Sequence, residues 1–408
     1  MTYYEIKKVF SKRSSKISLV IMLAVVVFNL YVIVSDITYV NENGHEERGL
    51  GVVAKVRELK KTWAGDLTED KIRSVIEENI RIFRSPEALS GDVQQLKKAD
   101  SQKQGFYDLL ALMIYDYGGF NFYDYNVTDS LTPDMAADFY PNRIKTLKDW
   151  LDSEGKDQFS VKEKNYLIAQ YEAMDTPLYY DYQEGWKSLF QYAPSINMIV
   201  TLVLSFLCAG IFSTEFQLKS SAILYSSYHG RNRAILAKVK AGLIIITVIY
   251  WVFMLLYTGL VLGILGADGA NCPIQSYMTG WKSIYNIKNW QEYLLVVLGG
   301  YLGCLFMLLL TMLVSAGTNS TVIAVIVPFV LIFLPAFLSG TSIPMLNKIL
   351  GILPDQLLQM NIVVKYFNLY EIGGRIFCAA PLLVVVYLLA AVLIIPAIYV
   401  TYRKKQVY

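Results

Sequence analysis

The sequence is poor in charged residues, and the shortage is concentrated in a few long stretches. Charged residues make up 17% of the 408 residues, against about 25% in a typical soluble chain. The stretch 241–265 has no charge at all and is long enough to cross a bilayer, which requires about 20 apolar residues. A soluble enzyme is therefore excluded. A net charge of +3 provides no basic surface for nucleic acid, so that partner is excluded too.

Groups that carry out chemistry are also scarce. Two histidines and four dispersed cysteines leave little for a zinc or haem site. The sequence lacks the Gly-x-x-x-x-Gly-Lys-Ser/Thr loop that cradles nucleotide phosphates. Neither His45 nor His229 forms a recognisable catalytic pair with a nucleophile in the sequence, and the two are predicted to lie on opposite sides of the membrane. We therefore predict that this chain is not an enzyme, with no catalytic residue, no metal site and no cofactor bound to it.

Six apolar segments predict an all-α integral membrane protein. The first span, 17–39, follows a basic tail and has no small-residue cleavage site after it, so we interpret it as a retained anchor. Residues 1–16 before it have apolar side chains on one helical face, typical of a cytoplasmic amphipathic helix at the membrane interface. The region 195–400 holds the other five spans, predicted at 195–213, 241–265, 293–315, 321–339 and 379–400.

Charge predicts how these spans are oriented. Basic residues cluster in the N-terminal tail, the 214–240 loop and the 401–408 tail, whereas acidic residues outnumber basic ones in 40–194. Short cytoplasmic segments of membrane proteins carry an excess of Lys and Arg. Both termini and the 214–240 loop are therefore expected in the cytoplasm, and 40–194 outside it. The cores of spans two to six carry essentially no charge, which argues against proton- or sodium-coupled transport.

The 40–194 segment has the pattern of a mainly helical extracytoplasmic domain that folds by itself. Ser160 and Glu163 form a capping-box pattern, and few windows alternate with period two, so strands are expected to be minor. Aromatic residues near its end predict a belt at the membrane interface: Tyr179, Tyr180, Tyr182, Trp186 and Tyr192. The 340–378 segment is apolar but broken by prolines and charges, which predicts short helices at the outer interface.

Small residues and cysteines suggest how the spans pack. The pairs Gly259/Gly263 and Gly299/Gly303 have the small-x-x-x-small spacing of close helix packing, either within the chain or between two copies. Cys272 and Cys378 are both predicted outside the cytoplasm, where an oxidising environment would permit a disulfide. Two free thiols are the alternative.

The 214–240 loop combines aromatic and basic side chains. A loop that only carries positive charge has no need of exposed apolar residues, whereas a mixture of aromatic residues and arginine is typical of a docking surface. A solvated loop without a partner is the alternative interpretation. The residues that we predict to form the docking surface are Glu215, Phe216, Ile223, Leu224, Tyr225, Tyr228, Gly230, Arg231 and Arg233.

The sequence has an amphipathic N-terminal helix, six spans, a Phe-x-x-Glu motif at the end of the second span, and a Gly-Arg pair and a Lys before the third. In these features it resembles the type-2 permeases of ATP-binding-cassette exporters. The segments around Gly185-Trp186 and Leu353-Pro354 are similar to a Gram-positive bacterial branch, here with a long extracytoplasmic domain. The positions matching the general pattern are Phe212, Glu215, Ile223, Leu224, Gly230, Arg231 and Lys238.

This resemblance implies a permease subunit in the bacterial plasma membrane, with the loop acting as a coupling helix seated on a separate ATPase subunit. ATP and magnesium would be bound by that ATPase, and a second permease copy, identical or related, would complete the pathway. The uncharged span cores favour an amphipathic peptide, lipid or drug-like substrate. The alternative is a mechanotransmitting or sensor protein of the same class, which moves its outer domain and transports nothing.

Overall fold

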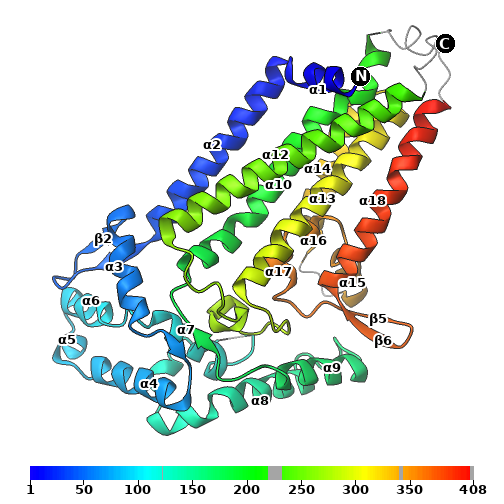
Figure 1. Cartoon of the computed structure of the whole chain (residues 1–408). Helices are drawn as coiled ribbons and strands as arrows, with labels where there is room; N and C mark the ends of the chain where they lie inside the picture. The colour runs from blue at the N-terminus through cyan, green and yellow to red at the C-terminus, as the bar shows by residue number, and fades with distance from the viewer. Residues whose placement is uncertain (122, 219–231, 340–342, 405–408) are drawn as a thin grey trace.

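The computed structural model describes residues 1–121, 123–218, 232–339 and 343–404 (Figure 1). Six helices in this part of the chain are long and apolar enough to cross a membrane, which confirms the six predicted spans. They are α2 (Arg13–Asp36), α10 (Glu184–Gln217), α12 (Arg233–Leu265), α13 (Asn289–Thr318), α14 (Thr321–Leu338) and α18 (Ala379–Arg403). Figure 1 shows them as one bundle, with the short helix α1 (Thr2–Phe10) across one end.

Several spans are longer than their apolar segments. Helix α10 begins at Glu184 instead of 195, and α12 begins at Arg233 instead of 241. Hydropathy locates only the apolar part of a helix, and the backbone stays helical where polar side chains have partners. The first turn of α10 is of this kind, because Glu184 forms ion pairs with Lys60 and Lys187.

Residues 37–183, here called the head, lie at the end of the bundle away from α1 and the chain termini (Figure 1). The head is mainly helical, as predicted, and the capping box of Ser160 and Glu163 is present. Its helices are α3 (Leu50–Lys61), α4 (Glu69–Phe83), α5 (Pro86–Leu89), α6 (Val93–Ser101), α7 (Tyr107–Tyr117), α8 (Phe139–Asp152) and α9 (Val161–Glu172), with 3-10 turns η1 (Val127–Asp129) and η2 (Pro133–Asp138).

Strands are few and short in the described residues. In the head, β1 (Thr38–Val40) pairs antiparallel with β2 (Glu46–Arg48), and β3 (Gly65–Asp66) with β4 (Tyr179–Tyr180). A third pair was not predicted: β5 (Leu369–Ile372) and β6 (Arg375–Cys378) form a hairpin. Its two-residue turn is Gly373-Gly374, with φ of +58° and +78°, a conformation that glycine adopts without strain.

The head shares its core with a later part of the chain. Trp281, from the segment between α12 and α13, is buried among head residues such as Phe139. The buried Arg143 donates to the carbonyl oxygens of Trp281 and Ser283, both at 3.0 Å. Residues 40–194 therefore do not enclose their own core, because the apolar pattern of a helix does not reveal which segment covers it. The 3-10 turns η3 (Ile274–Ser276) and η4 (Met278–Gly280) belong to this covering segment.

The predicted aromatic belt is wrong for three of its members, of which Trp186 is buried and donates its ring N–H to the carbonyl oxygen of Ala267. Tyr180 and Tyr182 are fully buried in the protein, so neither can face lipid headgroups. Tyr180 instead donates to the carboxylate of Asp108 at 3.0 Å. The head and the bundle meet where these tyrosines lie, and the aromatic residues fill that junction.

Glycines in α13 let two short helices, α16 (Asp355–Leu358) and α17 (Met360–Val363), pack closely against the bundle. A third, α15 (Pro344–Leu350), precedes them in the segment predicted to contain short helices. A Cβ on Gly299 would lie 2.5 Å from Met360, and one on Gly303 would lie 2.8 Å from Leu358. The Gly299/Gly303 pair therefore provides close packing of α16 and α17 within the chain. No described atom lies within 4 Å of a Cβ built on Gly259 or Gly263.

Candidate functional site

The ends of the 214–240 loop lie beside α1, at the end of the bundle away from the head (Figure 1). Of the predicted docking residues, Glu215 and Phe216 lie in the last turn of α10, and Arg233 is the exposed first residue of α12. The other six lie outside the described residues: Ile223, Leu224, Tyr225, Tyr228, Gly230 and Arg231. The structure therefore describes the base of the loop.

A buried lysine joins three elements at this base. The Lys238 ammonium lies 2.6 Å from Glu215 Oε1, 2.9 Å from Glu5 Oε1 and 3.0 Å from the carbonyl oxygen of Ile211. Its side chain is fully buried. An ammonium has three donors and no acceptor, so these three oxygens satisfy it completely. A charge can be buried in this way only when it is paired and hydrogen-bonded.

The second carboxylate oxygen of Glu215 connects a fourth element. Tyr402, near the end of α18, donates its hydroxyl to Glu215 Oε2 at 2.8 Å. Its ring packs edge-on against Phe212, with the ring centroids 4.9 Å apart. Lys8 of α1 also lies 3.5 Å from Glu215. We call Glu5, Lys8, Glu215, Lys238 and Tyr402 the loop-base cluster. It fastens α1, α10, α12 and α18 together where the loop leaves the bundle.

Hydroxyl groups extend these connections to the remaining helices beside the loop. The backbone N–H of Ser213 donates to Ser315 Oγ at 3.1 Å, and the Ser213 hydroxyl lies 2.8 Å from that of Thr321. Ser315 belongs to α13 and Thr321 begins α14. The end of α10 therefore has polar contacts, direct or through Lys238, with five other helices.

Sequence reasoning singled out two of the five residues of the loop-base cluster. Glu215 and Lys238 are positions at which the sequence resembles type-2 permeases. Glu5 and Tyr402 were missed, because they lie far from the loop in the sequence and no motif marks them. A lone acid in a basic N-terminal tail, Glu5, was the one available signal.

A second buried charge cluster fastens the head to the bundle. The Asp108 carboxylate of α7 lies 2.9 Å from Lys60 of α3 and 2.7 Å from Lys187 of α10. Burial acts to raise the pKa of Asp108, but the charges of Lys187 and Lys60 outweigh burial and hold the pKa below its ordinary value. Nearby, Asp268 lies 2.6 Å from both Arg57 and Lys61. These ion pairs connect the head to α10 and to the segment after α12.

The predicted disulfide is absent from the structure. All four cysteines lie in the described part of the chain, and each is a free thiol. Cys378 lies 3.2 Å from the hydroxyl of Tyr166, and burial raises the pKa of Cys272 to about 12. A shared side of the membrane does not bring two cysteines within the short distance that a disulfide requires.

Neither charge cluster has the composition of a catalytic centre. In both, the carboxylates are held by lysines. Among the described residues, no group of three or more His, Cys, Asp or Glu side chains could hold a metal ion. The arrangement is that of a mechanical connection between helices.

Six helices long and apolar enough to span a membrane, an N-terminal helix held at the loop base and a mainly helical head define a polytopic membrane protein. Residues 8–405 match the family described as ABC-2 family transporter protein, and the chain belongs to this family. Its members are membrane components of ATP-binding-cassette transporters, which work with an ATPase subunit and are generally not catalytic themselves. No curated protein and no solved structure matches the chain.

Proposed function

We propose that this chain is the permease subunit of an ATP-driven exporter in the bacterial plasma membrane. A separate ATPase subunit, which binds ATP and magnesium, docks on the 214–240 loop. The loop-base cluster is the observation that supports this function. A docking surface can drive a permease only if its movement reaches the membrane spans. The buried Lys238 provides such a connection, because it links both ends of the loop to α1 and, through Glu215, to α18.

In this proposal the loop and both termini are cytoplasmic, and the head is extracytoplasmic. The excess of basic residues around the loop and in the tails supports this orientation. The head lies at the far end of the bundle, joined to α10 by the Asp108 ion pairs. A second permease copy, identical or related, completes the pathway, and the cargo is an amphipathic peptide, lipid or drug-like molecule.

The test is co-purification with an ATPase. The chain is expressed in its host with an affinity tag, and a variant carrying Arg231→Glu with Tyr225→Ala is compared with the wild type. We expect the wild type to retain an ATP-binding-cassette ATPase and the variant to lose it at equal expression, because the variant removes an aromatic anchor and reverses a charge in the loop.

Lys404→Glu is the matched control, because it reverses an exposed charge in the C-terminal tail outside the loop. It should retain the ATPase. A wild type that retains no ATPase, or a double variant that retains as much as the wild type, contradicts the proposal.

A further inference from the structure

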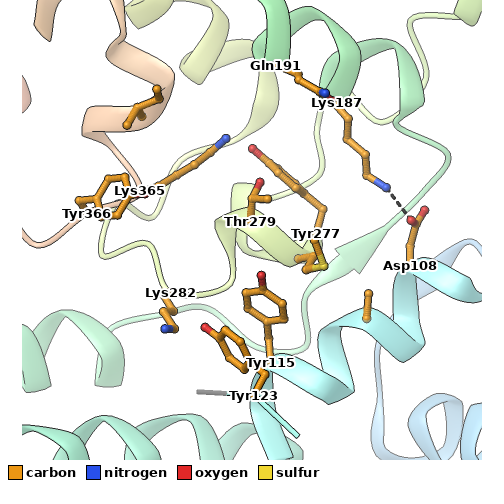
Figure 2. A pocket seen from close by; sticks show the side chains of 13 residues that line it. Asp108, Tyr115, Tyr123, Lys187, Gln191, Tyr277, Thr279, Lys282, Lys365 and Tyr366 are labelled. Carbon is orange, nitrogen blue, oxygen red and sulfur yellow. Dashed lines mark ion pairs between the residues drawn. The ribbon is translucent and has the colours of Figure 1, made fainter. Parts of the chain in front are cut away.

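A cavity of about 720 Å³ lies where the head meets the bundle (Figure 2). Its walls come from α7, α10, the segment around η4 and the residues at and just after α17. Pockets that hold small organic molecules occupy about 300–1,000 Å³ and lie preferentially between domains. The size and position of this cavity therefore fit a binding site.

Three lysines and one carboxylate line the cavity. Lys187 is held by Asp108 at 2.7 Å, as described above, and Lys365 lies 3.7 Å from the buried Glu292. Lys282 differs from both, because no carboxylate in the described part of the chain lies within 4.0 Å of its ammonium. Its acceptors are the carbonyl oxygen of Phe120 and, at 3.4 Å, the side-chain oxygen of Asn121. Among the three lysines that line the cavity, Lys282 is thus the one whose charge is not balanced by a described carboxylate within 4.0 Å.

The local environment makes this unbalanced charge costly. Burial lowers the pKa of Lys282 to about 8, since a charged ammonium loses hydration there. The ammonium lies over the ring of Tyr123, 4.9 Å from the ring centroid, which gives partial compensation. An anion in the cavity would provide the missing opposite charge.

Aromatic rings form the rest of the binding surface. Tyr115 and Tyr123 are stacked, with ring centroids 4.1 Å apart and planes at 23°. Figure 2 shows this pair beside Lys282, with Tyr277 and Lys365 reaching into the cavity from other sides. Offset stacking on tyrosine suits a flat ring, and the tyrosine bodies suit an apolar chain.

We propose that this cavity binds an anionic amphipathic molecule, with a phosphate or carboxylate group at Lys282 and an apolar or aromatic body against Tyr115 and Tyr123. The site joins the head to the bundle, so its occupancy is sensitive to their relative position. The proposal stands on the cavity itself and holds whether the molecule is cargo or a regulator.

Binding to the full chain in phosphatidylcholine nanodiscs tests this proposal. The probes are 2-naphthyl phosphate, neutral 2-naphthol and cationic 2-naphthylmethylammonium, titrated by calorimetry. We expect the phosphate to bind about tenfold or more tightly than the other two, because a charge-assisted hydrogen bond contributes about 1.5–3 kcal/mol. Nanodiscs that contain the anionic lipid phosphatidylglycerol distinguish the natural source of the anion. If this lipid weakens binding of the phosphate probe, the natural ligand is a lipid phosphate. If binding of the probe is unchanged, the natural ligand is a water-soluble anion.

Variants locate the binding site. Lys282→Gln should weaken binding of the phosphate probe about tenfold, whereas Lys145→Gln, an exposed lysine on α8, should leave it unchanged. If Lys282→Gln fails to fold, Ala111→Leu provides the test, because it fills part of the cavity wall without changing a charge. Equal affinity for the three probes, no binding of naphthyl phosphate, or unchanged binding to both cavity variants overturns the proposal.

Discussion

Lys238 is the residue on which the loop base depends most. Its ammonium is fully buried and holds Glu5 and Glu215 together. Removing one partner of a buried ion pair typically costs about 3–5 kcal/mol, because the other charge is left uncompensated. We expect Lys238→Met to lower the melting temperature of the detergent-solubilised chain strongly. Lys240→Met, at an exposed position two residues further along α12, should change it little.

A partial rescue distinguishes this pairing from a general effect on α12. Adding Glu215→Gln to Lys238→Met removes one of the two carboxylates that have lost the Lys238 ammonium, so the double variant should melt at a higher temperature than Lys238→Met alone. Equal melting temperatures for Lys238→Met and Lys240→Met would contradict the description of the cluster.

Asp116 is a buried carboxyl group that, unlike the Lys238 ammonium, is not held by an ion pair in the described part of the chain. It is fully buried in the head, and neither carboxylate oxygen has a hydrogen-bond partner among the described residues. Burial raises its pKa well above the ordinary value of 3.8. The unfolded chain therefore loses this proton at a lower pH than the folded chain, so stability falls as the pH rises above the unfolded pKa.

Asp116→Asn should therefore raise the melting temperature at pH 8, because the wild type must either bury a charge or take up a proton on folding, and the amide, which keeps the shape of the side chain, does neither. The gain should shrink as the pH falls towards 4, where the folded wild type is protonated at this position. Thermal melts of both proteins across this range are the measurement. A gain that is independent of pH would show that the carboxylate is not the cause.

From the sequence, individual residues of the site could be predicted only where a motif marked them. Glu215 and Lys238 carry a resemblance to known permeases, and both lie in the loop-base cluster. Tyr402 and Glu5 could not be assigned, because their roles arise only when α18 and α1 pack beside α10. The sequence left a disulfide and two free thiols open for Cys272 and Cys378, because their positions depend on the packing of the head, and both are free thiols in the structure.

At the level of elements, the two glycine pairs provide a matched comparison. Gly303 faces α16, whereas Gly263 has open space beside it. Gly303→Leu should lower the stability of the chain by about 1–3 kcal/mol, as overpacking typically does. Gly263→Leu should have a much smaller effect. The two melting temperatures in detergent test this difference, and equal losses would contradict the packing described for α13.

Helices and strands could be predicted from the sequence where their pattern of apolar residues or their capping residues were clear. Six spans follow directly from hydropathy, and Ser160 with Glu163 marks the start of α9. The early start of α10 was not predictable, since Glu184 is helical only because Lys60 and Lys187 pair with it. The β5–β6 hairpin lies in a segment whose prolines and charges suggested only short helices.

For the whole molecule, the shared core determines how independent the head is. Residues 40–183 carry strong helical signals, so the isolated segment should give a helical circular dichroism spectrum. Trp281, however, is missing from that segment, and loss of a large buried side chain costs about 3–5 kcal/mol. Fusion of residues 270–288 through a flexible linker should therefore raise its melting temperature by at least about 5 °C.

The same fusion carrying Trp281→Ala is the control, and it should give a much smaller increase. A segment that melts at the same temperature with and without the fused residues would show that the head encloses its own core after all.

The central claim is that an ATPase docks on the 214–240 loop, and that the head lies on the opposite side of the membrane from this ATPase. Site-specific photo-cross-linking tests it directly. A benzophenone amino acid replaces Tyr225 in the loop or, as control, the exposed Tyr125 in the head, and cells are irradiated before purification. The account predicts a cross-link to an ATP-binding-cassette ATPase from position 225 and none from position 125. An ATPase cross-link from position 125, or none from position 225 in a complex that retains the ATPase, would contradict it.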